Sequence, residues 1–328
     1  GFKKKKLFNT LADNHITGGR SSGQTKKCTE LALIKRITSQ KMPRIKLREL
    51  IKKSSQALLD MKPCFIMSPT VLSELVVAQE DFFDLLIIDE ASQMRMEDSI
   101  CALARSKQCV IVGDQQQLPP SNQFNASTDD DEDEENDLVE ESILDLANSR
   151  FKANRMLKWH YRSRHESLID FSNHHFYQNQ LIIPPSPVTT SAVTSKKVDA
   201  FYKGKINIQE KDKLILDLIP FMEANIRKGD GDKKSKSCLI VTMNIFQAES
   251  IEDDINKRKL EYPIIEEYEN SWKDTGEEFT VKNLESVQGD ERDVIFVSTI
   301  FGPEGPGKKT KQNFGPINNK GGQRRLNV

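Results

Sequence analysis

The sequence lacks any long hydrophobic run. Its 328 residues are 37% hydrophobic and 30% charged, and no stretch approaches the ~18 consecutive apolar residues of a membrane-spanning helix. The lysine-rich start, Gly1 to Lys6, has no apolar segment behind it, so we do not expect it to be a secretory signal peptide. We therefore expect no membrane partner and a cytoplasmic location. The length suits about two domains, and the missing initiator Met predicts a fragment of a longer protein.

Cysteine is scarce and has no pattern. The chain has five cysteines and no C-x-x-C pair, which argues against a disulfide framework or a zinc ribbon and fits a reducing compartment. Cys64, Cys109 and Cys238 lie in apolar runs, so we expect them to be buried. The five histidines have no matching cysteine or carboxylate pattern, which favours surface or capping roles over a metal site.

Charge of each sign is concentrated in one segment, although the net charge is only −1. Residues 1–60 hold 15 Lys and Arg against 4 Asp and Glu, whereas residues 129–141 hold 10 Asp and Glu and no base. A basic segment of this density indicates binding to nucleic acid or another polyanion. A solvated helix surface explains the same charges equally well, so both interpretations stay open. The acidic run is typical of a loop.

The apolar spacing predicts helices and strands that alternate along the chain. Residues 1–24 predict little order, and residues 26–60 predict two helices separated at Pro43. Strands are expected at 64–67, 82–88, 109–112, 238–243 and 294–300, and further helices at 97–104, 164–177 and 245–259. This alternation predicts an α/β fold with parallel sheets, whose chemistry gathers at the carboxyl ends of the strands.

The sharpest local pattern is the apolar run Leu85 to Ile88, which is followed by Asp89 and Glu90. This is the Walker B arrangement. Its first carboxylate holds Mg²⁺ through water, and its second activates the water that attacks the γ-phosphate of ATP. Two carboxylates that cap a strand and begin a helix explain the same residues, so both interpretations are kept at this point.

Three further blocks follow. After the run 109–112 come Gly113, Asp114 and Gln117, where a Gln can sense a γ-phosphate. The block 159–166, Trp-His-Tyr-Arg-Ser-Arg-His-Glu, contains arginines suited to reach a phosphate. The block 287–296 contains a Gly turn that leads into a strand. Taken alone, the first is better explained by a polar turn and the second by a basic helix start, and a charged turn also explains the third.

Together these four blocks resemble, in order and spacing, motifs II, III, IV and V of superfamily 1 helicases. The branch is the one that includes the nonsense-mediated-decay helicase and senataxin, and large bacterial helicase-like proteins are the most similar. Residues 324–328, Arg-Arg-Leu-Asn-Val, resemble the opening of motif VI. Residues 67–70, Met-Ser-Pro-Thr, resemble the strand-binding motif upstream of Walker B. The resemblance covers about residues 35–328, and five linked motifs in one order argue strongly against coincidence.

The resemblance implies two RecA-like P-loop NTPase domains that hydrolyse ATP between them and step along single-stranded DNA or RNA. The implied organisation is a basic, partly helical segment over 1–60, the C-terminal part of a first RecA-like domain over 61–128, an acidic loop over 129–141 and a second RecA-like domain over 142–328. Related bacterial proteins often carry a nuclease domain, so the longer protein is expected to have room for a fused or associated nuclease.

The resemblance also implies a role for each matching residue. Asp89 would hold Mg²⁺ and Glu90 would be the general base. Gln117 would contact the γ-phosphate, and Arg162 would be an arginine finger. The nucleotide would be bound by Asp114, Gly289, Glu291 and Arg325, with Glu291 on the ribose. The nucleic-acid strand would lie along Ser68, Pro69 and Gln288.

The sequence departs from this family at the phosphate-binding loop. Residues 18–25, Gly-Gly-Arg-Ser-Ser-Gly-Gln-Thr, fit the loop pattern except that Gln24 replaces the lysine that neutralises the β- and γ-phosphates. No apolar strand precedes this segment, so a Gly/Ser linker is the better explanation. We therefore expect the P-loop upstream of Gly1, a first domain truncated at its N-terminus, and no ATP hydrolysis by this chain alone.

Two other functions were weighed against a helicase. A non-catalytic nucleic-acid-binding or scaffold module that keeps the helicase fold is the alternative, and the missing P-loop lysine motivates it. A transporter-type or ring ATPase fits poorly with the Gly-Asp-x-x-Gln and Tyr-Arg-Ser blocks. The sequence leaves open whether the strand is DNA or RNA, and in which direction the motor travels.

Overall fold

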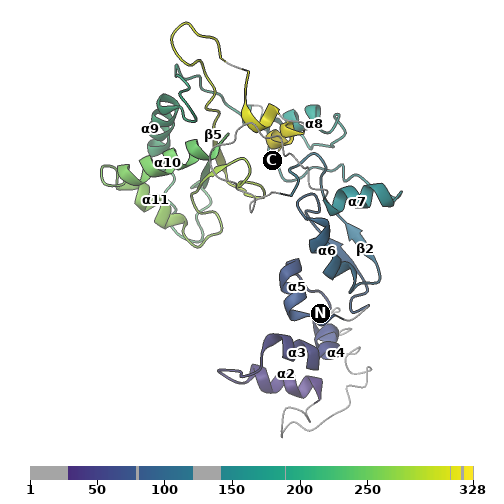
Figure 1. The fold of residues 1–328 in the computed structure, drawn as a ribbon. Helices are drawn as coiled ribbons and strands as arrows, with labels where there is room; N and C mark the ends of the chain where they lie inside the picture. The colour runs from purple at the N-terminus through teal and green to yellow at the C-terminus, as the bar shows by residue number, and fades with distance from the viewer. Residues whose placement is uncertain are drawn as a thin grey trace. The chain divides into compact units, whose positions relative to one another are not determined.

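The computed structural model describes residues 29–78, 81–120, 142–188, 190–310, 312–318 and 321–327. The chain forms two compact units, each described here by itself (Figure 1). The first unit comprises the chain up to Gln115 together with Pro119–Asn154, and the second comprises Gln116–Leu118 together with Arg155–Val328. The expectations for residues 1–24, with the P-loop-like segment, and for the acidic run fall outside the described residues.

No helix in the described part of the chain combines the length and the apolar character that crossing a membrane requires.

The first unit begins with three helices, α2 (Glu30–Thr38), α3 (Leu47–Lys53) and α4 (Ser55–Met61). Pro43 lies in the loop between α2 and α3, as predicted. The second expected helix is divided at Ser54, whose hydroxyl donates to the Leu50 carbonyl at 2.6 Å; such a side-chain bond competes with regular helix. The Glu30 carboxylate accepts the Ala57 N–H at 2.7 Å and joins α2 to α4.

A two-stranded parallel sheet forms the rest of the first unit. Its elements are α5 (Pro69–Leu75), β1 (Leu86–Ile88), α6 (Met96–Leu103), β2 (Cys109–Ile111) and α7 (Ile143–Arg150). β1 pairs with β2, and Ile88 lies opposite Ile111. Ile88 and Ala91 pack against Ile143 and Leu144. This contact places α7 in the first unit, so the division between the units falls after Asn154 rather than at the acidic run.

The strand expected at residues 64–67 is wrong, because these residues form no strand and pair with none among the described residues. Cys64 is exposed, which corrects the expectation that it is buried, and Ile66 is 99% exposed. Phe65 and Met67 anchor the segment: the Phe65 ring lies 5.6 Å from that of Phe83, and Met67 packs against Leu72 and Val76. Cys109 is only partly buried, whereas Cys238 is buried as expected.

The second unit contains a three-stranded parallel sheet in the order β4-β3-β5. Its elements are β3 (Cys238–Thr242), β4 (Val281–Asn283), β5 (Val294–Ser298), α8 (Asp170–His175), α9 (Ile208–Ala224), α10 (Ile245–Arg258) and α11 (Ile264–Trp272). The strands expected at 238–243 and 294–300 and the helix at 245–259 are confirmed. α9, α11 and β4 were not expected, and the helix expected at 164–177 is a 3-10 turn at Glu166–Leu168 followed by the short α8.

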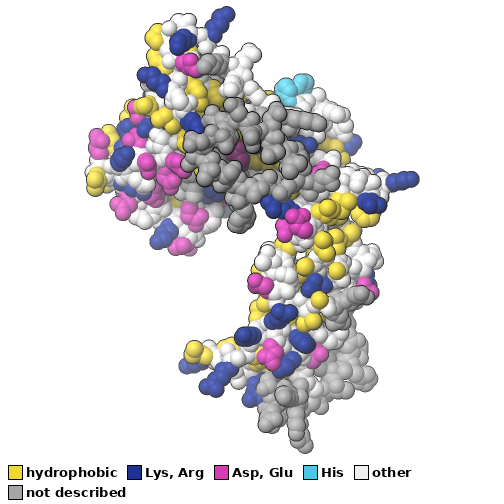
Figure 2. All heavy atoms as spheres, in the orientation of Figure 1, with side chains coloured by type: hydrophobic (Ala, Val, Ile, Leu, Met, Phe, Trp, Pro, Cys, Tyr) yellow, Lys and Arg dark blue, Asp and Glu magenta, His cyan; other side chains and the backbone are white. Residues whose placement is uncertain are grey.

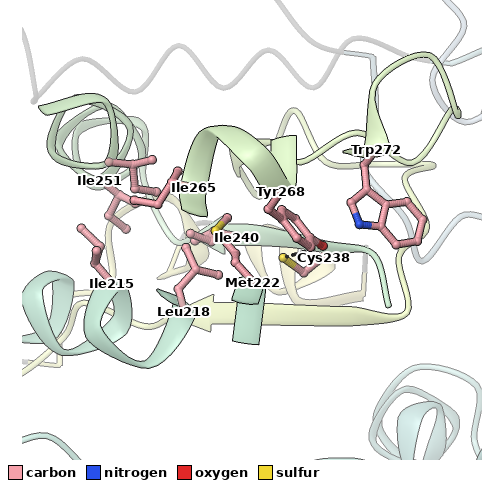
Figure 3. Close-up of a cluster of buried hydrophobic side chains, with 10 residues drawn as sticks. Ile215, Leu218, Met222, Cys238, Ile240, Ile251, Ile265, Tyr268 and Trp272 are labelled. Carbon is pink, nitrogen blue, oxygen red and sulfur yellow. Dashed lines mark hydrogen bonds between the residues drawn. The ribbon is translucent and has the colours of Figure 1, made fainter. Parts of the chain in front are cut away.

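The core of the second unit lies between β3 and the helices α9, α10 and α11 (Figure 3). All five residues of β3 are buried because β3 is the central strand. Ile240 of β3 packs with Leu218 of α9, Ile251 of α10 and Tyr268 of α11. The opposite face of the sheet holds a smaller cluster, which is formed by Leu239, Val241, Leu284 and Val287. Two 3-10 turns, Gly315–Asn318 and Gly322–Asn327, follow β5.

Candidate functional site

The carboxyl end of β1 carries the two Walker B carboxylates. Asp89 and Glu90 are both exposed, and the Asp89 carboxylate accepts the Glu90 N–H at 3.0 Å. Glu90 has a φ of 52°, a left-handed conformation that costs a non-Gly residue free energy. Gln93 donates to the Glu90 carboxylate at 3.3 Å and to its carbonyl at 3.0 Å. The turn is therefore held by its own side chains, and it presents Glu90 to water.

Gly113 brings the segment after β2 against the segment after β1. The Val112 N–H donates to the Ile88 carbonyl at 2.8 Å, and the Ala91 N–H donates to the Val112 carbonyl at 2.9 Å. A Cβ at Gly113 would lie 2.9 Å from the Ser92 nitrogen, closer than real Cβ atoms approach. Glycine is thus required here by close approach of two backbones.

The half-buried Asp114 follows directly after this contact, so Asp89, Glu90 and Asp114 lie at neighbouring strand ends, as predicted for a parallel sheet. Exposed carboxylate oxygens suit Mg²⁺, which keeps several of its waters and uses one or two protein carboxylates. Asp89 is exposed and commits one oxygen to the Glu90 N–H, so it fits the role of a water-mediated ligand.

In the second unit, Gln117 lies beside Gln288. The Gln288 side-chain amide donates to the Gln117 side-chain oxygen at 2.9 Å. Gly289 follows with a φ of 87°, the left-handed region that glycine adopts without strain. Two residues that the sequence assigned to different motifs are therefore brought together by a direct hydrogen bond.

Two arginines of the 159–166 block pair with two acids that precede β5. Arg162 Nε lies 2.7 Å from the Glu291 carboxylate, and Arg164 lies 3.1 Å from the Asp293 carboxylate. Asp293 also accepts the Ser237 N–H at 3.2 Å and is mostly buried, whereas Arg162 and Glu291 are mostly exposed. Asp293 is thus held against the sheet, whereas Arg164 and Arg162 are both largely exposed and accessible.

A histidine turn sets the position of Arg162. His160 Nε2 accepts the Ser163 N–H at 3.2 Å and lies 2.8 Å from the Ser163 hydroxyl, so the chain folds back around Arg162. Burial lowers the pKa of His160 below its ordinary value, and the nearby Arg162 charge lowers it further. Both causes favour the neutral ring, which is the form that accepts the Ser163 N–H.

The last described residues belong to the same region of the second unit. Arg325 donates to the Glu285 carboxylate at 2.9 Å. The Asn327 side-chain amide donates to the Gln116 carbonyl at 3.1 Å and to the Tyr177 hydroxyl at 2.7 Å. Asn327, Asp293 and His160 had no assigned role in the sequence analysis. The sequence indicated these residues only through their position in the segments 159–166, 287–296 and 324–328. The hydrogen-bond partners of Asn327 and Asp293 are distant along the chain, so these contacts themselves were not predictable.

A buried polar group supports the end of β5. Gln247 donates to the Ser298 hydroxyl at 3.3 Å and accepts the Asn207 N–H at 2.9 Å. Glu210 accepts the Ile300 N–H at 3.2 Å. Ile300 is fully buried and has a φ of 59°, which is rare for a β-branched residue. The chain after β5 is thus held in a strained conformation by its neighbours.

The two residues expected on the nucleic-acid strand begin α5 in the first unit. The Ser68 hydroxyl accepts the Val71 N–H at 3.4 Å and caps the helix, and Pro69 occupies its first turn. Ser68 is exposed. The structure places these residues in the first unit and Gln288 in the second, so it does not bring the three together within one unit.

Known proteins that are similar in sequence to this chain indicate its family. A model for an AAA domain matches residues 13–122. The uncharacterized ATP-dependent helicase MG140 of Mycoplasma genitalium and its homolog in Mycoplasma pneumoniae are each 32% identical over 288 residues, which cover 84% of this chain and 24% of each relative. The uncharacterized ATP-dependent helicase MJ0104 of Methanocaldococcus jannaschii is 24% identical over 258 residues, or 75% of this chain and 34% of the relative. The chain spans about a quarter of the length of the two mycoplasma relatives.

Proposed function

Because the chain belongs to the superfamily 1 helicase family, we propose that it works as part of an ATP-dependent motor that moves along single-stranded nucleic acid. The relatives are named ATP-dependent helicases. The branch of the nonsense-mediated-decay helicase and senataxin, which the motifs resemble, is part of the proposal. The proposal also covers the strand, which is DNA or RNA, and a nuclease that acts together with the motor.

The first unit would supply the groups that activate water. Asp89 would hold Mg²⁺ through water, and the ion would offset the negative charge of the phosphates. Glu90, exposed at the neighbouring position, would accept a proton from the attacking water. Its left-handed backbone turns the carboxylate away from the strand and toward solvent. Asp114 would lie along the nucleotide on the adjoining strand end.

The second unit would supply the groups that recognise the nucleotide and respond to it. Arg162 would stabilise the charge on the transferred phosphate, an effect worth ~10³–10⁵ in rate in other phosphoryl-transfer enzymes. Glu291 would bind the ribose, and Gly289 and Arg325 would contact the nucleotide. Gln117 would sense the γ-phosphate. Its hydrogen bond to Gln288 would then pass the nucleotide state to the strand that Gln288, Ser68 and Pro69 contact.

The observation that carries the proposal is the turn after β1. A carboxylate residue occupies a left-handed position that Gly would adopt at no cost, and it stands exposed beside a second carboxylate. Capping a strand needs no such conformation. The turn therefore favours a chemical role for Glu90 over a structural one.

The test is ATP hydrolysis with and without single-stranded DNA and RNA, in the longest natural form of the protein that contains this sequence. Glu90→Gln should lower strand-stimulated turnover by at least about 10²-fold while nucleotide binding persists, because the amide cannot accept the proton. Glu97→Gln, another exposed Glu in the first unit, is the matched control and should turn over normally. Equal turnover in the parent and the Glu90→Gln protein would exclude the proposed general base.

A non-catalytic strand-binding module is the second candidate, and Gln24 in place of the P-loop lysine favours it. It predicts strand binding that neither nucleotide nor Glu90→Gln changes. Binding measured with and without ATP and Mg²⁺ therefore separates the two functions. A change in strand affinity on nucleotide addition supports the motor, and an unchanged affinity supports the module.

A further inference from the structure

The helices α2, α3 and α4, residues 30–61, form a small group that we call the basic helical module. The module is strongly positive, because residues 29–61 contain eight Lys and Arg against three Asp and Glu. Dark blue side chains outnumber magenta ones around these helices in Figure 2. None of the Lys and Arg residues of this module is among the proposed catalytic or strand-contacting residues. The positive charge of the module therefore has no role in the proposed function.

The module uses its acids internally. Glu30 accepts the Ala57 N–H, Asp60 accepts the Gln56 amide at 3.0 Å, and Glu49 forms an ion pair with Lys53. The Lys53 bond and the positive charge of Lys46 both lower the pKa of Glu49. Glu30 thus joins α2 to α4, and Glu49 and Asp60 are each occupied by one neighbour on their own helix, which leaves most of the bases without a carboxylate partner in this module.

The remaining bases stand exposed on the loop before α3 and on α3 itself. They are Lys41, Arg44, Lys46, Arg48 and Lys52. In the described part of the chain, none of the five forms an ion pair with a carboxylate. Arg48 and Lys52 are four residues apart on α3, an arrangement in which like charges repel and destabilise the helix. An external anion that lies against such a pair would offset this repulsion.

The position of the module indicates which anion. α3 lies against α5, and α5 begins at Ser68 and Pro69, the two residues proposed to contact the nucleic-acid strand. A phosphate backbone supplies regularly spaced negative charges that five separate bases can follow.

We propose that the basic helical module binds the phosphate backbone of the same single strand and extends the strand contact beyond α5. The inference rests on the proposed function. It adds a binding surface that acts through phosphate charge and does not read the base sequence, since Lys and Arg side chains on an exposed loop contact phosphates regardless of sequence.

The test is strand binding by the whole chain, measured by fluorescence anisotropy with a labelled oligothymidylate of about 20 nucleotides. The variant Lys41→Gln/Arg44→Gln/Arg48→Gln/Lys52→Gln removes four exposed charges and buries nothing. We expect its affinity to fall at least about tenfold at low salt, and the slope of log affinity against log salt to decrease by about 2 to 3. A variant that exchanges Lys and Arg at the same four positions keeps the charge and should keep the affinity.

The matched control removes four exposed lysines from the second unit, in the segment between α9 and β3: Lys228→Gln/Lys233→Gln/Lys234→Gln/Lys236→Gln. It makes the same change in net charge and should bind like the parent. Equal losses in the two variants would overturn the inference, because net charge alone would explain them. A parent chain with no salt-dependent strand binding would overturn it as well.

An acidic protein partner is the competing occupant. Polyglutamate should displace the oligonucleotide only weakly if phosphates are the ligand, and displacement as efficient as by unlabelled oligonucleotide would overturn the inference. These results are independent of the Glu90→Gln test. A parent and a four-base variant that bind the strand equally well would refute the module alone, while loss of turnover in Glu90→Gln would still support the motor.

Discussion

The two units carry parallel sheets whose apolar side chains meet very different surroundings. In the second unit the whole of β3 is buried, and three helices cover one face of its sheet. In the first unit Leu85, Ile87 and Val110 are 50%, 62% and 47% exposed. Both units follow the same α/β pattern. Only the second has a central strand that is buried on both faces. The edge strand β5 of the second unit also exposes Ile295 and Val297, by 47% and 55%, so the difference lies in the central strand and the helices that cover it.

A core truncation should show the largest difference between the units. Ile251→Ala removes a fully buried side chain from the second core and should lower the free energy of unfolding by about 2–5 kcal/mol. Ile87→Ala removes the same atoms from an exposed site in the first unit and should change it by less than about 0.5 kcal/mol. Urea unfolding followed by tryptophan fluorescence measures the first value, because Trp159 and Trp272 both lie in the second unit, and circular dichroism measures the second. Equal losses of unfolding free energy in the two variants would show that the two units do not differ in how their apolar side chains are buried.

Gly113→Ala should destabilise the first unit selectively. The added Cβ would meet the Ser92 and Ala91 nitrogens at 2.9 and 3.1 Å, and overpacking of this kind costs about 1–3 kcal/mol. Gly231→Ala in the second unit is the control, since a Cβ there meets nothing within 4 Å. Hydrogen exchange should become faster at β1 and β2 and remain unchanged at β3. Uniform acceleration would mean that the units do not unfold separately.

Acid should weaken the second unit through His160. Its folded pKa lies below the ordinary value of 6.5, so the unfolded chain binds the proton more tightly. The stabilisation is complete above pH 6.5 and is lost as the pH falls through the lower folded value. Melting curves of the parent and His160→Gln, compared between about pH 8 and 5, should differ in slope over that window. Parallel pH profiles of the two proteins would show that the His160 ring does not contribute to the pH dependence of stability. All described histidines lie in the second unit, so no matching change is expected at β1 and β2.

Breaking an exposed ion pair should change stability least, and the change should be similar in the two units. Glu291→Gln breaks the pair with Arg162 in the second unit, and Glu49→Gln breaks the pair with Lys53 in the first. Each should leave the melting temperature nearly unchanged, because water screens exposed charges. Thermal melts would check both. A large loss at position 291 alone would assign a structural role to a residue that we propose to contact the ribose.

The sequence predicted those parts of the fold in which local patterns and tertiary contacts agree. The runs at β3 and β5 are apolar and β-branched, so both strands were found. The run at 64–67 is also apolar, but it has only one β-branched residue and no partner strand among the described residues, and it stays outside the sheet. β4 is only three residues long, and α9 contains Pro220, which obscures its helical pattern. Such elements are fixed by packing that no local pattern carries.

The candidate site shows the same division. The position of Asp89 and Glu90 after a strand was predicted, since a strand and the turn behind it are adjacent in sequence. The hydrogen bond between Gln117 and Gln288 joins residues of different motifs, and the resemblance to a family gave their roles but not their contact. The hydrogen-bonded group of Asn207, Gln247 and the half-buried Glu210 could not be predicted, because nothing in the sequence separates these residues from ordinary surface polar residues.

The left-handed turn at Glu90 has a consequence for how this position would respond to selection. Glycine, and to a lesser degree asparagine, adopts a φ of 52° more readily than glutamate does. A library of variants sorted only for resistance to unfolding should therefore accumulate Gly or Asn at position 90. The same library sorted for ATP turnover should return Glu, so the two sorting regimes would pull one residue in opposite directions.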